Sequence, residues 1–484
     1  MGLLGILIGL GVLIWFAYRG WSVLLLAPIA AMVAAIFSGQ PLLAHWTQTF
    51  MGSAAGFVAQ FFPMFLLGAV FGKLMDDSGS VSAIAAWMTE KLGVRHAILA
   101  VVLAGALVTY GGVSLFVAFF VIVPMAQTLF RAAAIPKRLI PAAVALGTSS
   151  FTMSALPGTP SIQNAIPMPF FGTTPFAAPG LGLIASAIML AFGLWWLGRQ
   201  AGIAARNAEG YGDAADADMA AAAADPLVRE RASTARDFDP AEMAHGAHAE
   251  TLPPVWQAGL PLILVIATNV MMSLVILPRI DADFLALPEW GETSLAGVGG
   301  VWSVIVALIA GILTLLALSH RRLPSIRQTM DAGANASVLP ALAVASLVGF
   351  GAVVAALPAF SAVAEWVLTL GGGPLVSLAV AVNILAALTG SASGGLTIAL
   401  DALGSTYMEL AASLGIAPEL LHRVAVISAG TLDSLPHNGA VVTLLAVSGM
   451  KHGDSYVDLA ISSIGGALIA LVAVIALGTM FGSF

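Results

Sequence analysis

Long apolar runs occupy most of this chain of 484 residues. A membrane-crossing helix needs about 20 apolar residues to span a hydrocarbon core of roughly 30 Å. Ten runs meet or approach that length: residues 3–18, 22–37, 55–71, 139–170, 180–197, 256–277, 296–318, 338–357, 420–447 and 459–480. Residues 97–130 and 374–408 are also apolar, but small residues interrupt them midway. The pattern predicts an all-α polytopic membrane protein.

Charged residues gather in one segment. Of 43 charged side chains, 15 lie between Arg199 and Glu250, in a stretch without a sustained apolar stripe. We therefore expect a flexible cytoplasmic linker over residues 199–255, with a regulatory segment as the alternative. The predicted layout is N-terminal scaffold helices (1–38), a first repeat (39–198), the linker (199–255), connecting helices (256–317) and a second repeat (318–484).

The two halves of the chain share residues at a constant offset of 279 positions. The pairs include Trp87 and Trp366, Gly111 and Gly390, Ser114 and Ser393, Thr152 and Thr431, and Leu156-Pro157 and Leu435-Pro436. One register aligns them all without a gap. This agreement predicts a structural duplication.

Basic residues indicate how the halves are oriented. Short loops rich in Lys and Arg stay in the cytoplasm, as expected for the loop with Arg131 and Lys137, whereas the equivalent loop at 409–419 has no basic residue. Equivalent loops on opposite sides indicate inverted-topology repeats. Residues 97–130 and 374–408 are then re-entrant hairpins, and the alternative is two short crossings each.

Four breaks in apolar segments form two equivalent pairs. The hairpin tips lie at 109–114 and 389–394, and prolines interrupt the long runs at 154–160 and 431–439. Proline removes a helical hydrogen bond, and irregular backbone inside a membrane is tolerated only where protein or a watery cavity surrounds it. Free N–H groups and helix dipoles at such breaks attract anions. The candidate substrate-binding residues are Tyr110, Gly111, Gly112, Ser114, Pro157, Gly158, Thr159, Ser391, Ser393, Gly394, Asn438 and Gly439.

Three ionisable residues lie inside apolar segments, where such groups are functional candidates. His437 titrates near physiological pH, Asp433 precedes it by four residues, and Asp401 lies in the second hairpin. We assign all three to proton coupling, with orientation of His437 as the alternative for Asp433 and helix capping as the alternative for Asp401. The other histidines, including His422, lie near segment ends, where solvated surface is expected. Lys and Arg occur only near segment ends, so helix ends and hydroxyls would hold a single carboxylate.

Other function classes lack support. The chain has no basic stripe for nucleic acid and no cysteine, and Gly68 to Lys73 falls one residue short of a phosphate-binding loop. No motif indicates a metal site, a cofactor or an enzyme. The expected partners are a lipid bilayer and a small carboxylate.

At residues 71–75, 156–160 and 432–439 the sequence resembles the gluconate permease family of the ion-transporter superfamily. The resemblance implies proton-coupled uptake of a sugar acid or hydroxy acid, a fixed scaffold, a moving transport part and a homodimer. Gluconate carriers have an acidic residue in the first tip and a histidine at the first break. Tyr110-Gly111-Gly112 and Leu156 stand there instead, and residues 435–439 resemble branches associated with 3-hydroxybutyrate.

The sequence thus predicts a symporter that carries a small monocarboxylate, 3-hydroxybutyrate-like or a sugar acid such as gluconate, with a proton across a bacterial-type inner membrane by alternating access. The alternatives are sodium coupling and a selective organic-anion channel.

Overall fold

The computed structural model describes residues 2–19, 21–212, 229, 233, 238–368 and 371–484. All regular elements in these ranges are helical. Within the described residues, seven helices are long and apolar enough to cross a membrane, at residues 42–77, 115–132, 179–206, 255–279, 295–319, 326–356 and 452–481. Residues 80–92 and 94–110 form a further pair, bent by 103°. The expected all-α polytopic fold is confirmed.

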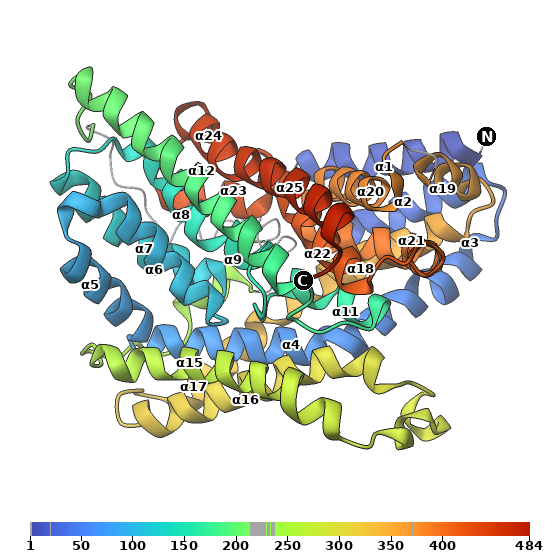
Figure 1. Cartoon of the computed structure of the whole chain (residues 1–484), viewed down its shortest axis with the longest axis horizontal. Helices are drawn as coiled ribbons and strands as arrows, with labels where there is room; N and C mark the ends of the chain where they lie inside the picture. The colour runs from blue at the N-terminus through green and yellow to red at the C-terminus, as the bar shows by residue number, and fades with distance from the viewer. Residues whose placement is uncertain (1, 20, 213–228, 230–232, 234–237, 369–370) are drawn as a thin grey trace.

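The N-terminal helices pack on the second half of the chain. Helices α1 (Gly2–Tyr18) and α2 (Val23–Phe37) lie beside α18 (Val338–Ala356), on the right in Figure 1. The face that α2 buries carries five fully buried alanines, at positions 27, 30, 31, 34 and 35. Small side chains let helix backbones approach closely, which is how helices associate in a membrane.

The first half continues as a series of helices around one helix hairpin. After α3 (Leu42–Ala44) and a π-helical turn at His45–Phe50, the chain forms α4 (Met51–Asp77), α5 (Ser80–Leu92), α6 (Ala97–Tyr110), α7 (Leu115–Ala132), α8 (Ile140–Thr148), α9 (Phe151–Ser154), α10 (Ile162–Ala165), α11 (Pro167–Phe171) and α12 (Pro179–Arg206). Helices α6 and α7 contact each other and join at residues 111–114.

The second half repeats this order. It contains α15 (Val255–Met271), α16 (Leu295–Ser319), α17 (Ile326–Ala336), α18, α19 (Phe360–Leu368), α20 (Gly373–Thr389), α21 (Ala392–Leu414), α22 (Pro418–Thr431), a 3-10 turn at Leu432–Ser434, α23 (Gly439–Val447), α24 (His452–Ala460) and α25 (Gly466–Phe481). Helices α12 and α25 run side by side in Figure 1 and contact each other.

Equivalent helix ends follow the offset found in the sequence. Helix α6 ends at Tyr110, and α20 ends 279 residues later at Thr389. The breaks after α9 and α22 and the long last helices correspond in the same way. This recurrence supports a duplicated element order. The inverted orientation, the re-entrant course and the repeat boundaries stay predictions.

The two longest apolar runs are interrupted rather than continuous. Residues 139–170 form α8 to α11, and residues 420–447 form α22, the 3-10 turn and α23. None of these pieces is long enough to span a bilayer alone, and the interruptions include the two proline breaks at 154–160 and 431–439. Prolines at positions 157, 160 and 436 account for the interruptions, because they cannot donate a helical hydrogen bond.

Parts of the expected linker are folded. Helix α12 continues to Arg206, and the Asp239 amide donates to the Ala336 carbonyl of α17 at 2.9 Å. Further along, the Ala249 amide donates to the Asp77 carbonyl at 2.7 Å. A wholly solvated tether over 199–255 is therefore wrong for these stretches, because backbone and ionic contacts with α4 and α17 hold them. Residues 213–228, 230–232 and 234–237 of the linker lie outside the described residues.

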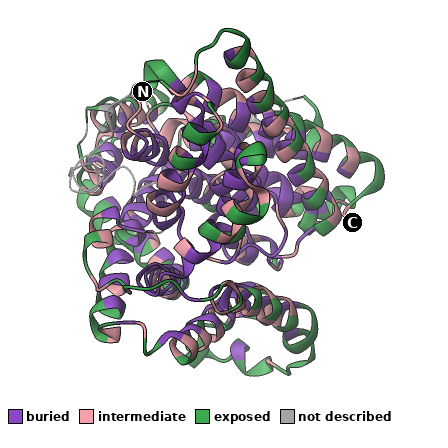
Figure 2. Ribbon diagram, turned by 90° about the vertical axis from the view of Figure 1, so that its left-hand side faces the viewer, coloured by how far each residue is buried: buried purple, intermediate pink, exposed green. Residues whose placement is uncertain are grey.

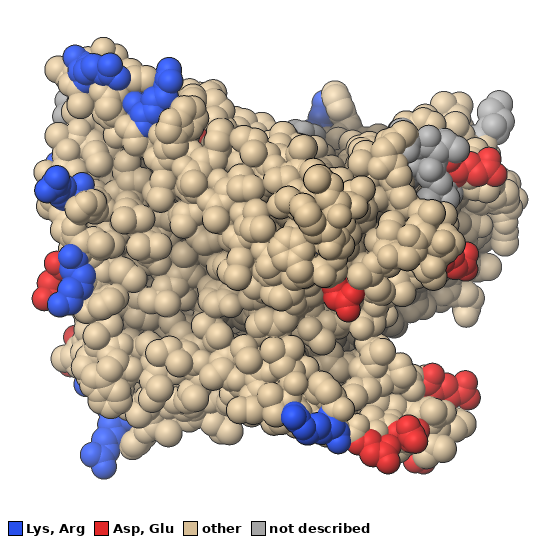
Figure 3. Space-filling view, viewed as in Figure 1, with Lys and Arg blue, Asp and Glu red and all other residues tan. Residues whose placement is uncertain are grey.

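Burial and charge are arranged as a membrane protein requires. Buried residues concentrate where the helices cross, and exposed residues lie at the periphery (Figure 2). On the face in Figure 3, uncharged residues cover the middle, most Lys and Arg lie toward one end, and Asp and Glu are frequent toward the other. Such asymmetry agrees with the excess of basic residues on the cytoplasmic side of membrane proteins.

Candidate functional site

The second hairpin tip and the second break meet through a buried carboxylate. Asp433 is 3% exposed, and its Oδ1 accepts hydrogen bonds from the Ala392 amide at 2.9 Å and from Asn438 Nδ2 at 2.7 Å. Asn438 Nδ2 also donates to the Gly390 carbonyl at 2.8 Å. Ala392 is the first residue of α21, so the carboxylate lies at the positive end of that helix dipole. The sequence-predicted residues Asp433 and Asn438 therefore join the tip to the break.

Local sequence determines this geometry. Asn438 caps α23, because its Oδ1 accepts from the Ala440 amide at 2.7 Å, and Ser391 caps α21 through the Gly394 amide at 3.1 Å. Asn and Ser are preferred helix N-caps. Gly390 has a φ of +63°, which favours glycine.

His437 lies directly over the second tip. Its Nε2 is 3.0 Å from the Ala387 carbonyl oxygen, and the ring is half-buried. A Cβ on Gly390 would lie 2.9 Å from His437 Cδ2, so glycine leaves the space that the imidazole occupies. His437 of the second break therefore lies against the second tip.

A small cavity of about 10 Å³ lies between the second break and helices of the first half of the chain. Asp433, Ser434 and Asn438 line it from one side, and Phe119 of α7 and Ser149 after α8 line it from the other. This cavity has room for about one water molecule and is too small for a hydroxy acid.

The first tip contacts the first break in the same manner. The Tyr110 hydroxyl donates to the Pro157 carbonyl at 2.8 Å. Gly112 has a φ of +100°, and a Cβ there would lie 3.3 Å from Pro160 Cγ. Asn269 of α15 donates to the Gly158 carbonyl at 3.0 Å. Backbone carbonyls freed by the prolines are thus satisfied by side chains, as buried polar groups must be.

Side chains within the first break are buried and mostly hydrogen-bonded. Asn164 Nδ2 donates to the carbonyls of Thr159 and Pro175, each at 3.0 Å. Ser161 caps α10 and donates its hydroxyl to the Met153 carbonyl at 2.8 Å. The Thr159 hydroxyl is buried and has no hydrogen-bond partner among the described residues.

The two broken helices cross at their small residues. Gly430, near the end of α22, lies against Ser154, the last residue of α9, and a Cβ on Gly430 would be 2.6 Å from Ser154 Cβ. Each residue comes immediately before its own break. The crossing therefore brings the two tip-and-break pairs next to each other.

His422 is buried, which corrects the expected solvated position. It is fully buried in α22, with Nδ1 2.6 Å from Thr173 Oγ1 and Nε2 3.1 Å from Asn164 Oδ1. Asn164 Nδ2 already donates to two carbonyls, so the atom that faces His422 is the amide oxygen, Oδ1. This oxygen can only accept, and Nε2 of His422 therefore carries the proton. A neutral ring then accepts the Thr173 hydroxyl at Nδ1. This link ties α22 to the first break.

Arg423 is a second correction, because we expected no cation at the site. It is fully buried, and its guanidinium donates to the Ala155 carbonyl at 3.1 Å and to the Ala177 carbonyl at 2.5 and 3.1 Å. Ala155 is the C-cap of α9, where helix dipoles favour a positive charge. A positive charge therefore lies at the first break.

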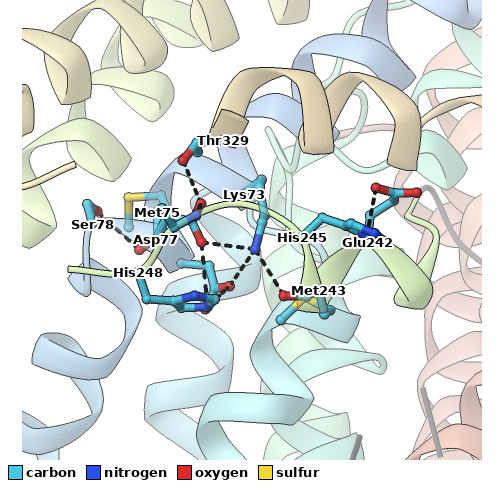
Figure 4. A network of polar contacts seen from close by, with 11 residues as sticks. Lys73, Met75, Asp77, Ser78, Glu242, Met243, His245, His248 and Thr329 are labelled. Carbon is cyan, nitrogen blue, oxygen red and sulfur yellow. Dashed lines mark hydrogen bonds and ion pairs between the residues drawn. The ribbon is translucent and has the colours of Figure 1, made fainter. Parts of the chain in front are cut away.

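The end of α4 carries a separate buried ionic cluster, shown in Figure 4. Lys73 Nζ lies 2.9 Å from Asp77 Oδ1 and 3.4 Å from Asp76 Oδ2, and the Thr329 hydroxyl of α17 donates to Asp77 Oδ2 at 2.6 Å. Lys73 and Asp77 are fully buried. The mutual attraction of these charges offsets their loss of hydration.

The linker completes this cluster. Lys73 Nζ donates to the Met243 carbonyl at 3.1 Å, and His248 Nε2 lies 3.3 Å from Asp76 Oδ2. The hydrogen bond to Asp76 raises the pKa of His248 above its ordinary value. The two carboxylates and His248 are close enough to share a cation, and the Lys73 ammonium supplies that positive charge. We assign the cluster a structural role.

Sequence comparisons identify the family. A profile described as GntP family permease matches residues 1–170. The uncharacterized transporter YxjC of Bacillus subtilis (strain 168) is 40% identical over 490 residues, which cover 100% of both chains. The chain belongs to the GntP permease family. The high-affinity gluconate transporter of Escherichia coli (strain K12) is 32% identical over 143 residues, 28% of this chain and 31% of that protein.

A solved structure shares the fold of this GntP permease. The Neisseria gonorrhoeae protein MtrF, described among antimetabolite efflux pumps, aligns with a TM-score of 0.53 and 15% identity, over 91% of this chain and 84% of that chain. The predicted family is confirmed, and the protein is a multi-pass membrane transporter of small molecules rather than an enzyme.

Of the remaining predicted site residues, two serines lie at helix N-termini and Asp401 lies away from the site. Ser114 caps α7 by accepting from the Phe116 amide at 3.3 Å, and Ser393 lies 3.3 Å from the Ser391 hydroxyl. Asp401 is exposed on α21 and forms no hydrogen bond or ion pair with the described residues. The structure does not bring Asp401 to the tips or breaks, because it faces away from the helix crossing.

Proposed function

We propose that this GntP-family permease carries a small monocarboxylate with a proton across the bacterial inner membrane by alternating access. A 3-hydroxybutyrate-like hydroxy acid or a sugar acid such as gluconate is the proposed substrate. The observation that carries the proposal is the bonding of Asp433 to both the second tip and the second break. The partial likeness to a gluconate transporter supports the substrate class.

A proton on Asp433 would change the contacts that close the site. The ionised carboxylate accepts two charge-assisted hydrogen bonds at Oδ1, from the Ala392 amide and Asn438 Nδ2. Such bonds are roughly twice as strong as those between neutral groups. Protonation weakens both and removes the negative charge at the α21 helix end. The second break can then move relative to the tip, which links proton binding to opening.

Two repeats, at residues 39–198 and 318–484, complete the proposed mechanism. Their breaks adjoin at the contact between Ser154 and Gly430, so a movement of one break displaces residues at the other. We propose that the repeats are inverted, because the basic loops of the first have no basic counterparts in the second. Opening then alternates between the two sides of the membrane. The homodimer implied by the family resemblance belongs to the same proposal.

Uptake by reconstituted vesicles tests this function. The wild-type protein should accumulate labelled 3-hydroxybutyrate or gluconate when an inward proton gradient is imposed, and preloaded unlabelled substrate should accelerate uptake. Accumulation that follows a sodium gradient and ignores the proton gradient would instead support the sodium-coupled alternative. A channel would show no acceleration by preloaded substrate, and that result would contradict alternating access.

A further inference from the structure

Arg423 is a buried cation whose charge no carboxylate of the described chain balances. Its side chain is fully buried, and it forms no ion pair with the described residues. The other cation discussed above, Lys73, has Asp76 and Asp77 as partners. Proteins pair their buried charges, because an isolated buried charge loses its hydration without compensation. Arg423 therefore differs from the ionic cluster at the end of α4.

The guanidinium also has spare hydrogen-bonding capacity. Arginine carries five N–H donors, and Arg423 uses three of them on the carbonyls of Ala155 and Ala177. Nη1 and Nη2 each retain one further donor. Such paired donors match the two oxygens of a carboxylate. The carbonyls of Ala155 and Ala177 offer only partial negative charge.

The position of Arg423 relates it to the first tip and break. Ala155 begins the first break, and Tyr110 of the tip donates to Pro157 two residues further on. Tyr110 and Arg423 therefore donate to backbone carbonyls that are two residues apart in the first break. One guanidinium and one hydroxyl therefore adjoin the same stretch of irregular backbone. His422, its neighbour in α22, lies within hydrogen-bond distance of Thr173 and Asn164 of the same region.

We infer that Arg423 is the fixed counter-charge for the carboxylate of the transported anion, which binds between its guanidinium and the Tyr110 hydroxyl. In this structure the carbonyls of Ala155 and Ala177 accept from three donors of the guanidinium, and a substrate carboxylate accepts from the two remaining donors when the first break opens. One fixed cation balances one negative charge, so monocarboxylates are favoured over dicarboxylates. This inference rests on the proposed transport of a carboxylate.

The test compares a charged ligand with a neutral one of the same shape. Thermal stabilisation of the purified full-length protein is titrated with 3-hydroxybutyrate and with 3-hydroxybutyramide. The wild-type protein should prefer the carboxylate by at least tenfold in apparent Kd. Arg423→Gln should bring this ratio close to one. The matched control Arg138→Gln should keep it, because Arg138 is already paired with Asp458 and Glu209.

A purely structural role for Arg423 makes a different prediction. If the arginine only holds the carbonyls of Ala155 and Ala177 in place, Arg423→Gln weakens the binding of both ligands by the same factor. An unchanged ratio of the two apparent Kd values would therefore overturn the inference. Arg423→Lys provides a second measurement if the glutamine variant does not fold. Lysine keeps the charge without the planar fork, so Arg423→Lys should keep a preference for the carboxylate that is smaller than that of the wild type, and equal affinity for the two ligands in this variant would overturn the inference.

Failure of the proposed function is seen separately. Wild-type vesicles are first tested for counterflow of 3-hydroxybutyrate and gluconate. Absence of counterflow with both would overturn carboxylate transport, and the Arg423 assignment with it. Counterflow in the wild type together with an unchanged charge preference in the variants would overturn the role of Arg423 alone.

Discussion

Single residues in this permease show how strongly its interior depends on complete pairing. One oxygen of Asp433 accepts two hydrogen bonds, and Lys73 forms ion pairs with the carboxylates of Asp76 and Asp77. In a low-dielectric interior, removing one partner of a buried pair costs more than the pair contributes, because the remaining charge is left without compensation. Functional and structural charges can therefore be told apart by their partners.

Lys73→Met tests the structural cluster at the end of α4. The substitution leaves Asp77 buried without its cation, and we expect a loss of about 3–5 kcal/mol of stability, the usual cost of breaking a buried ion pair. Thermal denaturation of the purified protein measures the change. The double variant Lys73→Met with Asp77→Asn should recover part of the loss, and equal stability of the single variant and the wild type would contradict this role.

The sequence indicates some of these residues and misses others. Asp433, His437 and Asn438 could be found because they interrupt an apolar run, where polar groups are conspicuous. His422 and Arg423 could not, because their position near the start of a run resembles a solvated helix end. They are buried because the first break and the loop containing Thr173 and Ala177 fold over them. The sequence offered one signal for the buried cation, because Arg423 lies three positions inside the apolar run that begins at residue 420.

Broken helices are the elements that define the candidate site. Each break follows a short helix, and the two short helices cross where Ser154 meets Gly430. The sequence predicts the breaks from proline and the repeat from the offset of 279 residues. It does not predict the crossing, because contacts between helices depend on packing that a linear pattern does not contain.

Gly430→Ala tests the crossing. The added Cβ would lie 2.6 Å from Ser154 Cβ, and overpacking of this kind costs about 1–3 kcal/mol, partly offset by the better helix propensity of alanine, up to about 1 kcal/mol. We expect a net loss of stability and slower transport. Gly453→Ala is the matched control, because Gly453 in α24 has open space around its Cβ position.

A thermal shift assay measures both glycine variants. Gly453→Ala should be neutral or slightly more stable than the wild type. A Gly430→Ala protein as stable and as active as the Gly453→Ala protein would contradict a tight crossing between α9 and α22.

At the scale of the whole molecule, a duplicated helix order brings each tip against its own break. The composition suffices to predict the fold class, because a sequence this apolar has to lie in a membrane. The folded parts of the linker were not predictable, since Lys73 and Asp77 read as ordinary helix-end charges until α17 and residues 239–250 enclose them. The central claim is that a proton on Asp433 releases the contact between the second tip and the second break.

Transport by Asp433→Asn vesicles tests that claim most directly. Asparagine resembles the protonated carboxylate in charge and cannot release a proton. The account predicts that this variant still exchanges labelled for unlabelled monocarboxylate but no longer accumulates it against a gradient when an inward proton gradient is imposed. Asp401→Asn, at the exposed carboxylate of α21, should accumulate substrate normally. Accumulation by Asp433→Asn equal to that of the wild type would contradict the account.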